Sequence, residues 1–131
     1  MPTATLTVPA APEQARTARL VAGAAARRAG VDPDSLDDVR LAVAEAVARA
    51  VLRSLADDAS QTEAVSVAMT DDGSSFEIAV ADRAVAASGG EDEFEESLAL
   101  SVMQSLASDS RIEANSDGGR TIILRWPTAT D

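Results

Sequence analysis

The spacing of hydrophobic residues changes several times along the chain, and each change marks an element. Residues 3–8 alternate between threonines and larger apolar side chains, which is typical of a short half-buried strand. Over residues 12–29, alanines recur at helical spacing, and Gly30 stands where that helix would end. Valines and leucines spaced three and four residues apart from Leu36 to Leu55 form the strongest stripe in the chain. They predict a second helix that lies in the core.

The period becomes two in the second half of the chain. Residues 65–69 and 76–80 each place apolar side chains on one face, and the segment 71–74 between them has the composition of a hairpin turn. A third helix is predicted around 98–106. A second hairpin then closes the chain, with strands at 111–114 and 120–126 and a turn at 116–119.

This order of elements predicts the class of fold. Strands with one apolar face and helices with one apolar stripe favour an α+β two-layer sandwich, in which about three helices cover one face of a mostly antiparallel sheet. The 131 residues are expected to form a single domain over 1–131. The segment 82–97 is rich in alanine, glycine and acidic residues, and repulsion within Glu91–Glu96 would keep it extended. We expect it to be a mobile lid.

Composition excludes several classes of function. The chain has no cysteine and no histidine, which excludes disulfides and thiolate metal sites and removes the commonest general base. Its 22 acidic and 11 basic residues give a net charge of -11. Such a chain should be repelled by nucleic acids and anionic membranes and should favour a basic protein partner. No targeting or membrane-spanning segment is evident, so a cytoplasmic location is expected.

Three stretches in the same order carry a resemblance to a known family. They are Arg16-Thr17-Ala18-Arg19, the segment 38–46 in the second predicted helix, and the segment 117–126 at the last hairpin. With them the chain resembles the RsbW-type anti-sigma factors, and in particular their actinobacterial branch. The resemblance implies the histidine-kinase-like ATPase fold, also called the Bergerat fold, over nearly the whole chain.

The resemblance also implies a set of site residues. In that family a glutamate on the middle helix is followed four residues later by an asparagine that holds magnesium; Glu45 and Arg49 stand at these positions. The aspartate that reads the adenine amino group is matched by Asp82, and the threonine that supports it is matched by Thr121. Arginine has five donors and no acceptor, so Arg49 cannot ligate a cation, although it could contact a phosphate.

The family's glycines around the nucleotide are replaced. Alanine or serine occupies four of these positions, which are Ala84, Ala86, Ser97 and Ala99. Each added Cβ narrows the space for backbone amides to approach phosphates. The resemblance therefore implies a degenerate ATP pocket. We expect no metal and no resident cofactor, and any binding of ATP with magnesium would be weak.

A simpler interpretation of the same helix remains open. Glu45 and Arg49 stand four residues apart, a spacing at which surface ion pairs contribute about 0.2–0.5 kcal/mol to a helix. Arg53 and Asp57 continue the same stripe. In this interpretation the four residues form only a solvated, ion-paired face.

The resemblance leaves three hypotheses for function. The first is an anti-sigma factor that sequesters an RNA polymerase sigma factor, is countered by an anti-sigma-factor antagonist with a STAS-type domain, and forms a homodimer; Arg16, Arg19 and Arg40 are placed near the partner surfaces. The alternative is an active ATP-dependent serine kinase that phosphorylates the antagonist, in which Glu45 would be catalytic. The third is a scaffold or decoy that has lost sigma binding.

Overall fold

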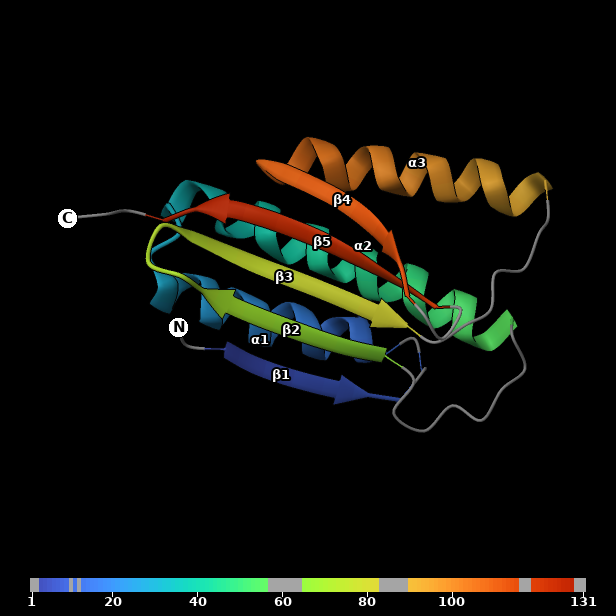
Figure 1. The fold of residues 1–131 in the computed structure, drawn as a ribbon, viewed down its shortest axis with the longest axis horizontal. Coiled ribbons are helices and arrows are strands. Elements are labelled where there is room, and N and C mark those ends of the chain that lie inside the picture. Colours follow the sequence, from blue (N-terminus) through green and yellow to red (C-terminus); the bar gives the residue numbers. More distant parts are fainter. Residues whose placement is uncertain are drawn as a thin grey trace.

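The part of the chain that the structure describes forms one antiparallel sheet of five strands (Figure 1). The structure is a computed structural model that describes residues 3–9, 11, 13–56, 65–82, 90–115 and 119–128, with only the backbone at 55–56 and 90–96. The strands are β1 (Thr3–Val8), β2 (Val65–Asp71), β3 (Ser75–Asp82), β4 (Asp109–Ala114) and β5 (Arg120–Pro127). Their order is β1-β2-β3-β5-β4, so β1 and β4 are the edge strands.

Three α-helices accompany the sheet within these residues. They are α1 (Gln14–Ala29), α2 (Leu36–Ala56), which follows a short 3-10 turn at Pro33–Ser35, and α3 (Gly90–Leu106). Figure 1 shows α1 and α2 side by side behind the sheet, with α3 next to the edge strand β4. This arrangement confirms the predicted α+β sandwich. None of the described helices is both long and apolar enough to cross a membrane.

Helix α2 forms the centre of the core, as its stripe predicts. Val39, Val43 and Val47 are completely buried, and they belong to the same core cluster as Val67 of β2 and Ile78 of β3. Burial of a side chain of this size contributes roughly 1.5–3 kcal/mol relative to leaving it exposed. The position of α2 against the sheet is therefore fixed by several such contributions along its whole length.

Helix α1 approaches α2 closely because the side chains between them are small. Ala18, Ala22 and Ala26 are buried, and the predicted terminator Gly30 ends the helix in a left-handed conformation with φ of 96°. Its backbone N–H donates to the carbonyls of Ala26 and Arg27. A residue with a Cβ would be strained at this φ, so glycine suits the end of this helix.

The third helix begins earlier than the hydrophobic pattern indicates. It starts at Gly90 rather than near Leu98, so the acidic run Glu91–Glu96 lies in the helix and not in an extended loop. Acidic residues near a helix N-terminus interact favourably with the helix dipole, which accounts for the difference. The remaining part of the expected lid, residues 83–89, lies outside the described residues. Strand β4 likewise begins at Asp109, two residues before its predicted start.

The C-terminal end of α3 is joined to the sheet by a tryptophan. Trp126 of β5 is buried, and its Nε1 donates a hydrogen bond of 3.0 Å to the carbonyl of Leu106, the last residue of α3. Met103 of α3 is buried in the same core. Both contacts hold the end of α3 that is closest to β4.

A carboxylate closes the turn between β2 and β3. Asp72 Oδ1 accepts hydrogen bonds from the backbone N–H groups of Ser74 at 2.9 Å and Ser75 at 2.7 Å. Gly73, which lies between Asp72 and Ser74, has φ of 90°. The backbone bond from Ser74, followed by that from Ser75, lowers the pKa of Asp72 from 3.8 to about 2, because both donors stabilise the ionised carboxylate.

We expect Asp72→Ala to lower the stability of the protein in a pH-dependent way. The folded pKa of Asp72 is depressed, so its stabilising effect is complete above about pH 4 and is lost as the pH falls through about 2. The difference in melting temperature between wild type and Asp72→Ala should therefore narrow between these values. Asp72→Asn cannot titrate at this position either. The difference in melting temperature between wild type and Asp72→Asn should therefore narrow over the same pH range. A difference in melting temperature that stays constant across this pH range would show that the ionised carboxylate of Asp72 does not stabilise the turn.

Candidate functional site

Residues from α2, β3 and β5 meet at one end of the sheet. Asp82 is the last residue of β3, and the antiparallel register places Ala81 opposite Thr121, the second residue of β5. The C-terminal part of α2 crosses this end and brings Arg53 to the same place. The structure thus brings together two of the predicted site residues, Asp82 and Thr121, with an arginine that the resemblance had not singled out.

The carboxylate of Asp82 is buried and is bound by Arg53. Its side chain is 2% exposed and that of Arg53 is 16% exposed. Arg53 Nε donates to Oδ2 at 3.0 Å and Arg53 Nη2 donates to Oδ1 at 3.4 Å. The backbone N–H of Arg120 also donates to Oδ1, at 3.3 Å. A two-pronged guanidinium–carboxylate pair of this kind fixes orientation as well as charge, so both acceptor oxygens of Asp82 are already engaged.

Thr121 interacts with Asp82 only indirectly among the described residues. Its hydroxyl donates to Asn115 Oδ1 at 2.9 Å, and Asn115 Nδ2 lies 3.5 Å from the backbone carbonyl of Asp82. The predicted support of the aspartate by Thr121 therefore reaches the main chain of Asp82 through Asn115, and not its carboxylate. Sequence reasoning missed Asn115, because nothing local distinguishes it from an ordinary residue at the start of a turn.

Arg49 lies about one turn and Glu45 about two turns before Arg53 on the same flank of α2. Both are partly buried, and no ion pair joins them among the described residues. The described contacts therefore do not support an ion pair between Glu45 and Arg49, and they show Arg53 bound to Asp82. Asp57 lies outside the described residues. The Nε of Arg49 is buried without a hydrogen-bond partner in the described part of the chain.

These residues do not fit a nucleotide with magnesium. Arg49 offers only donors where the family has a metal ligand, and the carboxylate of Asp82 is buried and bound by Arg53. Ala99, at one of the family's glycine positions, is 6% exposed, so its methyl group packs in the core. Within the described ranges, no group of three or more acidic side chains is placed to hold a metal ion. Ala84 and Ala86 lie outside those ranges.

The predicted partner residues lie on the other flank of α2 and on α1. Arg16 and Arg19 are exposed on α1, and Arg40 of α2 pairs with Asp37 at 2.9 Å. The side chain of Arg40 lies over Gly23 of α1, where an added Cβ would come within 2.7 Å of its Nε. The structure therefore brings Arg40 next to α1 and keeps it apart from Arg49 and Arg53.

The exposed surface of α1 has the opposite charge to the chain as a whole. The helix contains four arginines and no acidic residue, and all four arginines are exposed: Arg16, Arg19, Arg27 and Arg28. Leu20 among them is 60% exposed, and Leu41 on the neighbouring α2 is 54% exposed. We call these six residues and Arg40, whose charge is paired with the exposed Asp37, the α1 surface. It is basic and partly apolar, so the basic partner expected from the net charge of -11 does not match it.

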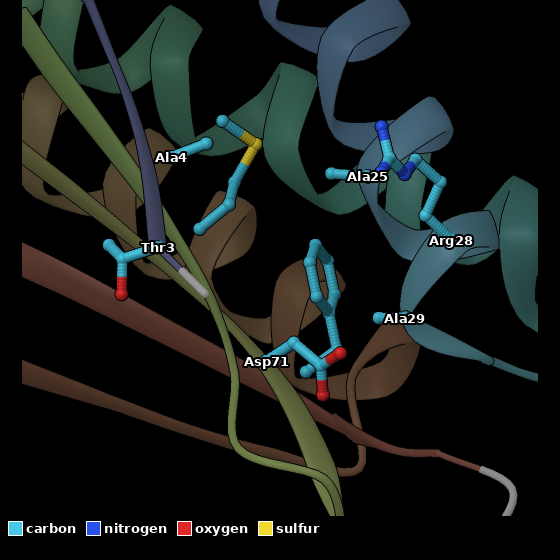
Figure 2. Close-up of a pocket in the computed structure, with 8 residues that line it drawn as sticks. Thr3, Ala4, Ala25, Arg28, Ala29 and Asp71 are labelled. Atoms are coloured by element: carbon cyan, nitrogen blue, oxygen red, sulfur yellow. The ribbon is translucent and has the colours of Figure 1, made fainter. Parts of the chain in front are cut away.

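A hollow lies at the opposite end of the sheet from Asp82. It has a volume of about 320 Å³ and is lined by residues of β1, β2, β3 and α1, including Met69 and Phe76. Figure 2 shows Arg28 on its helix side and Asp71 on its strand side. Alanines at positions 4, 25 and 29 leave this space unfilled. Apart from Arg28, which belongs to the α1 surface, none of the residues discussed above as site residues lines it.

Comparisons with known proteins agree with this geometry. The sequence pattern of the family described as "Histidine kinase-like ATPase domain" matches residues 8–126. A crystal structure of the RsbU and RsbW domains of Rv1364c from Mycobacterium tuberculosis matches with a TM-score of 0.71 and 26% sequence identity. The match covers 99% of this chain and 34% of that one, so the chain spans about a third of the protein it resembles. A comparison with curated protein sequences finds no match.

We expect the Arg53–Asp82 pair to stabilise the fold. Arg53→Ala breaks the ion pair with the buried carboxylate of Asp82, and should lower the free energy of unfolding by about 3 kcal/mol, the low end for a broken buried pair, because Arg53 retains some contact with solvent. In a double-mutant cycle with Asp82→Asn, followed by urea denaturation, the coupling energy should be at least about 1 kcal/mol.

A matched control is available on β4. Arg111 pairs with Glu113 at 2.9 Å, but the two side chains are 48% and 53% exposed. Arg111→Ala should therefore change the free energy of unfolding by less than about 0.5 kcal/mol. Independent effects of Arg53→Ala and Asp82→Asn, with no coupling, would show that the two side chains do not stabilise each other.

Proposed function

Because the chain belongs to the histidine kinase-like ATPase domain family, we propose that it is an anti-sigma factor of the RsbW type. It sequesters a sigma factor in the cytoplasm and is countered by a STAS-type antagonist. The similarity to a structure containing an RsbW domain, which extends over 99% of this chain, supports the proposal. As part of the same proposal, the chain acts as a homodimer.

The observation that carries the proposal is the α1 surface. Exposed arginines around an exposed leucine form a surface that combines charge with apolar area, as protein interfaces do. On a chain with net charge -11, a basic helix is the region to which an acidic segment of a partner is directed. The partner segment should therefore carry acidic and aliphatic residues, although the partner as a whole can be basic.

The proposed mechanism does not require a nucleotide. Arg49 offers no ligand for magnesium and the carboxylate of Asp82 already binds Arg53, so neither end favours ATP with magnesium. The amount of free sigma factor would then depend on competition between sigma and the antagonist for this chain, by mass action. Phosphorylation of the antagonist by another enzyme could shift that competition.

We expect the double variant Arg16→Glu and Arg19→Glu to lose partner affinity. Each sigma factor and each STAS-type antagonist of the source organism is tested for binding by interferometry, first with the wild-type protein. For the partner that binds, reversal of two charges on the α1 surface should raise the dissociation constant at least about tenfold, since like charges would face each other. Arg111→Glu on β4 serves as the control and should leave the dissociation constant within about twofold.

Two outcomes would contradict this part of the proposal. If no sigma factor and no antagonist binds the wild-type protein, the anti-sigma function fails. If a partner binds and the double reversal leaves the dissociation constant unchanged, the α1 surface is not where it binds.

We expect calorimetric titration of the wild-type protein with Mg-ATP to show no binding in the micromolar range, because no acceptor replaces the metal ligand at Arg49. The alternative function predicts the reverse. A micromolar, metal-dependent dissociation constant, with transfer of phosphate to a serine of the antagonist, would establish a kinase and would return Glu45 to a catalytic role.

A further inference from the structure

The ion pair between Arg53 and the buried Asp82 is the feature of the site that the proposed function leaves unexplained. Arg53 and Asp82 are 29 residues apart in sequence, and their side chains come from different layers of the fold. An ion pair on the surface contributes little to the stability of a protein. In this pair, by contrast, the carboxylate is almost completely removed from water. The arrangement gives the buried acid a permanent partner of its own chain.

We propose that Arg53 is a built-in occupant of the Asp82 site, which keeps adenine-type ligands out whether or not the phosphate end is intact. The inference rests on the proposed function in one respect: it takes from the family resemblance that Asp82 stands where the adenine amino group would bind. It goes further by identifying a second obstacle to nucleotide binding, separate from the lost glycines and from Arg49.

Hydrogen-bond chemistry favours the arginine over a ligand. The guanidinium donates two N–H groups to the two oxygens of Asp82, and it carries the charge that a buried carboxylate requires. An adenine amino group is neutral and donates one hydrogen bond to the same carboxylate. A ligand that displaces Arg53 would also break its ion pair with Asp82 in a site where the arginine is only 16% exposed.

Covalent connection strengthens the advantage of Arg53. A side chain held on α2 does not lose translational freedom when it binds Asp82, whereas a free nucleotide does. The effective concentration of such a tethered group is in the millimolar range or above. A free nucleotide would therefore have to overcome this tethering in addition to breaking the buried ion pair.

The site thus has two separate obstacles. One is at the phosphate end, and the family residues would be restored there by five substitutions: Arg49→Asn, Ala84→Gly, Ala86→Gly, Ser97→Gly and Ala99→Gly. The other is Arg53 at the adenine end. Restoring the phosphate end alone should leave nucleotide binding weak, because Asp82 remains occupied.

The test uses adenosine, which lacks phosphates and so probes only the adenine end. Wild type, Arg53→Ala, Arg53→Gln and the control Arg111→Ala are titrated with adenosine and with guanosine by ligand-observed NMR. Both Arg53 variants should bind adenosine at least tenfold more tightly than wild type. Guanosine should show no such gain, because it presents a carbonyl where adenosine presents its amino group. Arg111→Ala should behave as wild type.

A second measurement covers the case in which Arg53→Ala folds poorly. N-ethylguanidine replaces the missing guanidinium, so millimolar amounts should raise the melting temperature of Arg53→Ala more than that of wild type and should compete with adenosine. Arg53→Gln replaces the guanidinium with a shorter, neutral amide that retains most of the side-chain volume, and is the milder variant. The inference is overturned if the folded variants bind adenosine no better than wild type, or if N-ethylguanidine stabilises Arg53→Ala no more than wild type.

The final comparison separates this inference from the proposed function. The variant with all five phosphate-end substitutions is titrated with Mg-ATP, once with Arg53 and once with Arg53→Gln. Only the form with Arg53→Gln should bind Mg-ATP at least tenfold more tightly than wild type. Equal gains would overturn the inference. Failure of the wild-type protein to bind a sigma factor or antagonist would overturn the proposed function and would leave these titrations unaffected.

Discussion

The burial of one aliphatic helix against the inner face of the sheet determines the rest of this structure. Valines of α2 such as Val43 and Val47 are completely buried, and they are spaced so that one face of the helix is fixed on β2 and β3. Once that face is fixed, helical geometry assigns every other position of α2 to a side. One flank carries Arg53 to Asp82, and the other carries Arg40 toward α1.

The fold was predictable because its signals are local and periodic. The stripe from Leu36 to Leu55, the alternation in β2 and β3, and the turn at Asp72 each depend on neighbours within a few residues. The start of α3 was not predictable from apolar spacing, since residues 90–96 are mostly acidic. The site was predictable only as positions: Asp82 and Thr121 were expected together, but hydrophobic pattern gives no information on which cation reaches a buried acid.

Three arginines on one helix therefore have different environments despite similar local sequence. Arg40 makes an exposed pair with a neighbour one turn away, Arg49 has a buried Nε with no partner in the described residues, and Arg53 binds an acid on another layer. Spacing of four residues favours an ion pair with Glu45 for one of them, yet none is described. Tertiary packing decides between such options, because a buried carboxylate needs a cation far more than a solvated one does.

The indole of Trp126 fixes the C-terminal end of α3. Its hydrogen bond ends on Leu106, next to the buried Met103. The strand that carries Trp126 also donates to Asp82, through the backbone N–H of Arg120 at its other end. A slip of β5 by one residue would therefore break both hydrogen bonds at once.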